Sequence, residues 1–124
     1  MADGVTAAMA DAMLTALVTS PNGTYVALHT GAPGSAGTAN QSSVTTREAQ
    51  AYGSPSGGSV SATDTPTWSS WDGDNGEVLT DISKWNASSS GTFDWSEELS
   101  SSVTMDTGNT LELTADTASF TLAS

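Results

Sequence analysis

The chain has 124 residues and carries 14 acidic side chains against two basic ones, which gives a formal net charge of −12. A surface with that charge repels phosphate, so binding to nucleic acid or to an anionic membrane is disfavoured. The sequence has no cysteine, which excludes disulfides and thiolate chemistry. No apolar run approaches the roughly 18 residues of a membrane-spanning helix, and the first residues lack the cationic region of a signal peptide. We therefore expect a soluble protein that is made in the cytoplasm.

At this length we expect a single domain over residues 1–124, with an N-terminal helix and turn over 1–22 and a β-sandwich over 23–124. Hydrophobic residues make up 36% of the chain, a small share for a globular core, which favours an oligomer that completes the burial. The acidic residues are scattered along the chain. This pattern favours adaptation to high salt over an acidic segment that binds a cationic partner, although both interpretations stay open.

The first predicted element is a helix over residues 4–19, with Asp3 as the expected N-cap. Apolar side chains recur in it at helical spacing and form a stripe. The stripe consists of Val5, Met9, Met13 and Leu17, and Leu14 and Val18 widen it. We interpret the stripe as core or as the surface through which subunits dock on one another. Recruitment of a foreign partner is the alternative.

Beyond the helix, alternating apolar and polar residues predict about eight short β-strands, separated by turns rich in Ser, Gly, Asn and Asp. The stretches are 24–30, 44–51, 60–62, 67–68, 77–85, 92–99, 102–105, 110–114 and 118–122. The pattern predicts a mainly β, antiparallel, jelly-roll-like sandwich with one N-terminal α-helix. Immunoglobulin-like and other sandwich topologies stay open. The polar loop over 35–43 is expected to form an exposed, variable tip.

Three kinds of residue are candidates for chemistry. His29 is the single histidine and has no histidine or cysteine partner for a zinc site, so we expect it to be structural. Arg47 is one of only two cations, and we expect it to contact a carboxylate, within the subunit or across a subunit boundary. Asp72, Asp74 and Glu77 are weak candidates for a Ca²⁺ site. The EF-hand spacing fails around them, and an acidic Asn-Gly hairpin turn is the alternative.

Catalytic signatures are missing. The sequence has no G-x-S-x-G elbow, no phosphate-binding loop and no dinucleotide fingerprint. Four tryptophans are present; we expect at least two in the core, and the alternative is a sugar-stacking platform. We therefore predict no catalytic residue, no cofactor and no enzymatic activity.

Two segments resemble a known family. TYVALHTGAPGSAGTAN and KWNASSSGTFDWSEELSSSVTMDTGNTLELTADTASFTL are similar to parts of a family of small structural proteins of tailed viruses, described as tail fibre, minor tail or other virion proteins. The N-terminal helix and Arg47 match the same family. The resemblance implies a β-sandwich virion component without enzymatic activity.

The resemblance also suggests where the protein acts. We expect a homo-oligomer, a trimer or pentamer, that decorates the capsid surface or forms a turret on the major capsid protein. The alternative is a tail fibre or baseplate component that contacts tail proteins and binds a receptor or host glycan through loop 35–43 and exposed tryptophans. The expected docking residues are the helix stripe and Arg47. The acidic composition suggests a virus of a halophilic archaeal host.

Overall fold

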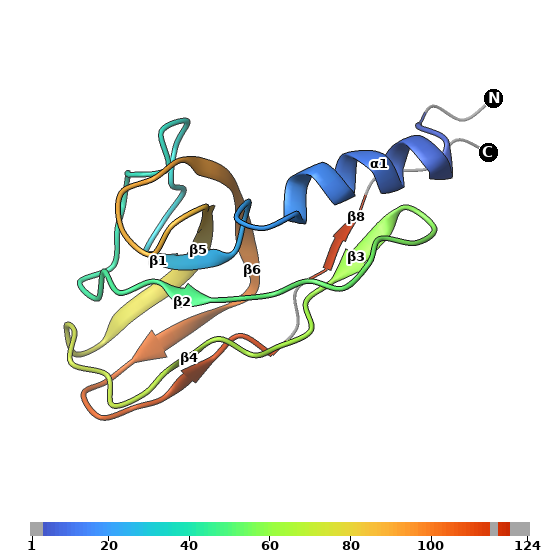
Figure 1. Ribbon diagram of the computed structural model, residues 1–124. Helices are drawn as coiled ribbons and strands as arrows, with labels where there is room; N and C mark the ends of the chain where they lie inside the picture. Colours follow the sequence, from blue (N-terminus) through green and yellow to red (C-terminus); the bar gives the residue numbers. More distant parts are fainter. Residues whose placement is uncertain (1–3, 115–116, 120–124) are drawn as a thin grey trace.

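The computed structural model describes residues 4–114 and 117–119. Over these residues the protein is mainly β, with one helix and eight strands that pair antiparallel (Figure 1). The elements are α1 (Ala7–Val18), β1 (Tyr25–His29), β2 (Glu48–Ala49), β3 (Ser59–Ser61), β4 (Thr67–Trp68), β5 (Glu77–Trp85), β6 (Phe93–Met105), β7 (Leu111–Glu112) and β8 (Thr117–Ser119). The predicted fold class, a small antiparallel sandwich-like fold behind an N-terminal helix, is confirmed.

The strands form one four-stranded sheet, in the order β2-β1-β5-β6, and two ribbons, β3-β8 and β4-β7. In the sheet, β1 pairs with β5 from Tyr25 opposite Trp85 to His29 opposite Asp81. Figure 1 shows the four-stranded sheet and β4 at one end of the molecule, with α1, β3 and β8 at the other. The chain therefore places its helix away from the main sheet.

Strand β6 differs most from the prediction. It runs unbroken over 13 residues, whereas we expected two strands, 92–99 and 102–105. Serines 100–102 do not interrupt it, because serine fits an extended backbone and the stretch has no glycine or proline. The irregularity is a bulge in β6 itself, because Leu79 pairs with Val103 and Asp81 with Glu98, so that residues 99–102 lie opposite the single residue Thr80. Strands β2 and β7 are shorter than expected, with two residues each. The expected strand over 118–122 lies partly outside the described residues.

The helix also begins later than predicted. Thr6 is the N-cap, and its hydroxyl accepts a hydrogen bond of 3.2 Å from the Met9 backbone N–H. Asp3, the expected N-cap, lies outside the described residues. The helix contacts β3 and β8 and buries Ala10 and Leu14. Met9, a member of the predicted stripe, is 55% exposed, so the interpretation of the stripe as core is wrong at this position.

The hydrophobic core lies between the four-stranded sheet and the segment that carries β4. Its buried members are Val26, Leu28, Trp68, Trp71, Leu79, Ile82 and Met105. Trp85 is buried as well, at 7% exposure. The prediction that at least two tryptophans belong to the core is confirmed. The alternative, a platform of exposed tryptophans that stack on a sugar, is wrong for Trp68, Trp71 and Trp85, because burial leaves no ring face open.

Candidate functional site

His29 lies at the end of β1 and is fully buried. Its Nδ1 lies 2.8 Å from the Ala39 carbonyl oxygen, and because a carbonyl only accepts, Nδ1 carries the proton. Nε2 therefore accepts from the Ser83 hydroxyl, 2.7 Å away, and Ser83 in turn accepts from the Trp85 indole N–H at 2.7 Å. This chain of hydrogen bonds joins β1, β5 and loop 35–43.

The surroundings of His29 keep its ring neutral. Burial lowers its pKa from the ordinary value of 6.5, although the hydrogen bond to Ala39 and the negative charge of Asp81 act in the opposite direction. A hydrogen-bonded Ser–His pair resembles the start of a nucleophile–base site. Here both side chains are 0% exposed, so a substrate has no access to the serine. The structural role expected for His29 agrees with this geometry.

Arg47 precedes β2, and its guanidinium group makes contacts within the subunit. Its guanidinium carbon lies 3.9 Å from the centroid of the Trp85 ring, and Nη1 donates to the carbonyl oxygens of Ala87, at 2.9 Å, and Ser90, at 2.8 Å. The Trp85 ring in turn packs on Phe93, with centroids 5.5 Å apart. We expected a carboxylate partner; the contacts that the structure gives Arg47 are carbonyls and a ring, because the turn at 86–91 directs its carbonyls at the guanidinium.

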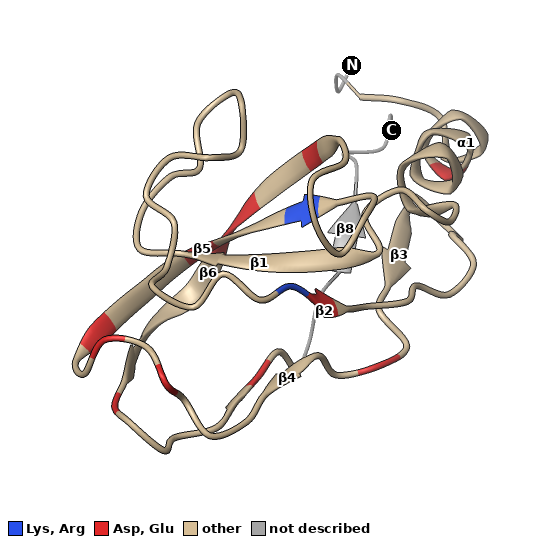
Figure 2. Ribbon diagram, turned by 60° about the vertical axis from the view of Figure 1, so that its left-hand side comes forward, with Lys and Arg blue, Asp and Glu red and all other residues tan. Residues whose placement is uncertain are grey.

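Lys84, the other cation, is 0% exposed on β5. Its ammonium donates to Gln50 Oε1 and, at 2.6 Å, to the Tyr52 hydroxyl. It also lies 4.8 Å from the centroid of the Tyr52 ring and 5.6 Å from that of Trp95, within the range of cation–π attraction. Figure 2 shows both cations on or beside the four-stranded sheet. We did not predict this cage, because its members come from separate segments.

The acidic turn over 72–77 binds a neighbouring loop. The Glu77 carboxylate accepts from the Ser42 hydroxyl and from the Ser43 backbone N–H at 3.1 Å. Partial burial raises the pKa of Glu77, but these hydrogen bonds outweigh it and lower the pKa below its ordinary value. Asp72 and Asp74 are exposed. Within residues 4–114 and 117–119, no group of three or more acidic or histidine side chains could hold a metal ion, so the three candidate ligands do not form such a group.

The same turn is not a hairpin. Strand β4 pairs with β7 and β5 pairs with β6, so the Asn75-Gly76 turn joins strands that belong to different sheets. The hairpin interpretation was wrong, because the residues before the turn find a better partner farther along the chain. The turn residues themselves were located correctly, and Gly76 adopts the positive φ of +78° that such a turn needs.

Loop 35–43 is exposed over most of its length, as expected, but several of its residues contact the rest of the fold. Gly37 is buried against the Phe93 ring, Ala39 accepts from His29, and Ser42 contacts Glu77. Within the loop, only Gly37 and Ser42 are buried, and the other residues are exposed. The polar composition of the loop therefore reflects satisfied hydrogen bonds as much as contact with water.

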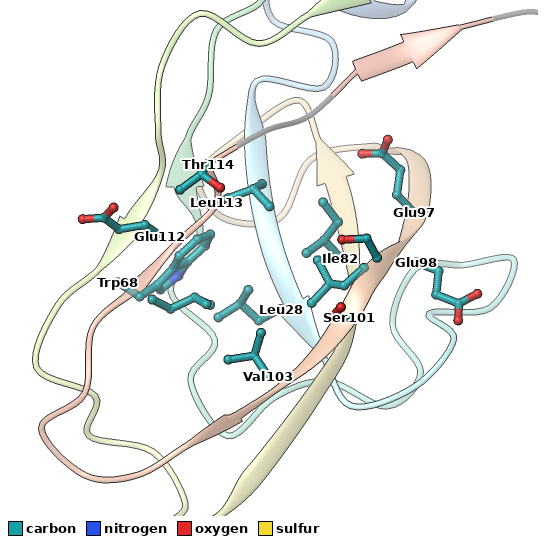
Figure 3. A pocket seen from close by; sticks show the side chains of 13 residues that line it. Leu28, Trp68, Ile82, Glu97, Glu98, Ser101, Val103, Glu112, Leu113 and Thr114 are labelled. Carbon is teal, nitrogen blue, oxygen red and sulfur yellow. The ribbon is translucent and has the colours of Figure 1, made fainter.

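A cleft of about 420 Å³ lies between β6 and β7, and we call it the β6–β7 cleft (Figure 3). Its floor is formed by the core residues Leu28, Trp68 and Ile82. Its apolar walls are Leu99 and Val103 on one side and Leu111 and Leu113 on the other. Carboxylates of Glu97, Glu98 and Glu112 lie along it. The cleft holds apolar surface that water reaches, with negative charge beside it.

A comparison with protein families places the chain. The family model described as Podophage GP4 fiber I protein gp80 matches residues 1–121. The chain belongs to this gp80 fibre family. The resemblance to structural proteins of tailed viruses is thereby confirmed. No curated protein matches the chain.

Membership of the gp80 fibre family supports a structural role in the virion and association with other virion proteins. The buried Ser–His pair and the two enclosed cations agree with a structural role, because each joins segments of the fold. No helix among the described residues is long and apolar enough to span a membrane.

Proposed function

We propose that this protein is a non-enzymatic subunit of a virion fibre, which assembles as a homo-oligomer and docks on other proteins of a tailed virus particle. The observation that supports the proposal is the match to a fibre family over residues 1–121. The hydrogen-bonded pair of His29 and Ser83 is fully buried and joins segments of the fold, which suits a structural role. Fibre subunits act by assembling and presenting a surface.

The helix stripe is the proposed contact between subunits. Ala10 and Leu14 are buried beneath the helix, whereas Met9 is 55% exposed, and Val5, Met13 and Leu17 are half-buried. One exposed and three half-buried apolar side chains at helical spacing favour burial against a second helix or sheet. Arg47, which we predicted as part of the same interface, already contacts Trp85, Ala87 and Ser90 within the subunit. We therefore limit the proposed interface to the helix.

The oligomer contact can be tested by charge insertion. Met9→Glu should shift the protein toward monomer in sedimentation at high salt, because the new carboxylate loses water when it enters an apolar contact. Ala8→Glu is the matched control, since Ala8 is also exposed on α1 but lies off the stripe. Equal effects of the two variants, or none from either, would remove the helix stripe from the proposal.

The position on the particle is a finer question. The description of the family supports a fibre, our alternative, whereas the capsid decoration or turret rested on the shortness of the chain and stays a prediction. Receptor or glycan binding by exposed tryptophans has less support, because Trp68, Trp71 and Trp85 are buried. Gold labelling of purified virions, with a copy count by quantitative mass spectrometry, tests the function itself. Absence of the protein from infectious particles would refute a structural role.

We also propose that the acidic composition is an adaptation to high salt. Among the residues that the structure describes, six acidic side chains are exposed: Asp64, Asp72, Asp74, Glu98, Asp106 and Glu112. The two cations are enclosed or half-enclosed and do little to balance them. Such a surface repels itself unless salt screens it. A halophilic archaeal host would provide that salt, and this host stays a prediction from charge.

A further inference from the structure

The β6–β7 cleft is an incomplete part of the core. Its floor residues are buried by 96% or more, with Leu28 and Ile82 at 3% exposure and Trp68 at 4%. The residues above them, Leu99, Val103, Leu111 and Leu113, pack on this core but stay only partly buried. Apolar walls around about 420 Å³ of open volume are a favourable place to bury further apolar side chains.

The charges beside the cleft select what can enter. Glu97 and Glu98 lie on β6 and Glu112 lies on β7. In Figure 3 the carboxylates of Glu98 and Glu112 point outward on opposite sides of the apolar floor. A segment that crosses the cleft therefore has its apolar side chains over the floor and its flanking residues beside carboxylates. Lysine or arginine at those flanks would complement them.

A second copy of this chain does not meet that requirement. Its only cations are Lys84, which is fully buried, and Arg47, which contacts two carbonyls and the Trp85 ring. Another copy would instead bring a net charge of −12 to the same carboxylates. The charge of the occupant must come from a different protein.

We propose that the β6–β7 cleft binds an extended segment of another virion protein, with alternating apolar side chains flanked by lysine or arginine. This rests on the proposed function, which supplies the other virion proteins. An extended segment fits because β6 is the last strand of its sheet and β7 the last of its ribbon, among the strands that the structure describes. Strand edges accept extended peptides by main-chain pairing, and alternate side chains then point to the same face.

The test uses an array of short overlapping peptides that tile every protein of the purified virion, this chain included. The full-length protein is applied to the array in low salt. We expect the bound peptides to share the cationic, alternating pattern. In solution, the best of them should change the fluorescence of Trp68 at the floor of the cleft and bind more weakly as salt rises.

Variants connect the binding to the cleft. Ser101→Phe fills it, because Ser101 is exposed on β6 beside the cleft, and should abolish binding. Glu98→Gln with Glu112→Gln should weaken binding about three- to tenfold in low salt, as expected for two exposed ion pairs. The control pair, Asp72→Asn with Asp106→Asn, removes the same charge from exposed positions that do not line the cleft and should change binding less than about twofold.

Each contrary result overturns the proposal. Binding only by peptides of this chain would make a second copy the occupant. Acidic or uncharged peptides that bind as tightly would remove the role of the carboxylates, and so would equal losses in the two charge pairs. Failure of all peptides to bind would remove the cleft as a docking site. The proposed function fails separately, if labelling finds no protein on the virion.

Discussion

Loop 35–43 is predicted to depend on the absence of one side chain, at Gly37. A Cβ atom on residue 37 would lie 2.4 Å from Phe93 Cγ and 2.5 Å from Cδ1. These atoms belong to the base of the ring, which cannot move away without a change in the Phe93 rotamer. The ring also packs on Trp85, which supports Arg47. Gly37→Ala therefore disturbs a stack that joins three segments.

The loss of unfolding free energy in Gly37→Ala has two parts, which a control variant can separate. The first is the left-handed backbone, with φ of +74° at Gly37, which costs an L-residue about 1 kcal/mol or slightly more. The second is overpacking against Phe93, which typically costs about 1–3 kcal/mol. Gly76 has nearly the same φ, +78°, and a Cβ there meets nothing within 4 Å. We expect Gly76→Ala to lose about 1 kcal/mol and Gly37→Ala about 2–4 kcal/mol.

Equilibrium unfolding in denaturant at high salt, followed by tryptophan fluorescence, measures both losses. For a chain of this size, the difference between the variants should lower the melting temperature of Gly37→Ala by roughly 3–10 °C more than that of Gly76→Ala. Equal losses would refute the reasoning, because they would mean that Phe93 yields without cost and that loop 35–43 is not anchored by this contact.

Three further predictions concern charge. Arg47→Ala should lower the free energy of unfolding by about 2 kcal/mol, because it removes two hydrogen bonds and a cation–π contact. Arg47→Lys should recover only part of this loss, because lysine lacks the planar guanidinium group. Denaturant unfolding measures both variants, and full recovery by lysine would contradict the prediction. Burial lowers the pKa of His29, so the unfolded chain binds a proton at this residue more readily than the folded protein does. The contribution of His29 to stability is therefore fully present above pH 6.5 and should be lost as the pH falls below that value. In His29→Gln, the free energy of unfolding should fall less steeply between neutral pH and the pH at which carboxylates begin to titrate. An unchanged dependence of the free energy of unfolding on pH would contradict the prediction. Stability should also drop on transfer from about 1 M salt, where the Debye length is about 3 Å, to about 0.01 M, where it is about 30 Å, and a melting temperature independent of salt would refute salt adaptation.

The sequence predicts best where one physical signal acts alone. Alternation of apolar and polar residues located β5 at 77–85, as observed, because one face of that strand meets the core. It divided β6 into two strands, because three consecutive serines look like a turn in composition. Pairing with β5 supplies backbone hydrogen bonds on either side of the serines, and that pairing lies outside the local pattern.

Side-chain packing determines which residues of the helix are buried, and the spacing of apolar residues alone does not predict this. The helix stripe was correct in spacing, but the helix turns Ala10 and Leu14 toward β3 and β8 and leaves Met9 exposed. A small side chain allows a close approach that a methionine would block, and spacing does not reveal this. The cage around Lys84 was missed for another reason, since Gln50 and Tyr52 are 34 and 32 residues away in the sequence. Their convergence depends on tertiary structure.

The enclosure of both cations also determines how a protease meets this protein. A protease that cleaves after lysine and arginine has only two sites in the chain, Arg47 and Lys84. Lys84 lies fully buried within β5, and Arg47 is held by the turn at 86–91. Cleavage at Lys84 requires β5 to leave the sheet, so the rate of cutting there follows the opening of the whole sheet. Trypsin resistance thus becomes a direct measure of the intact fold, and a particle that carries this protein would expose few sites to such enzymes.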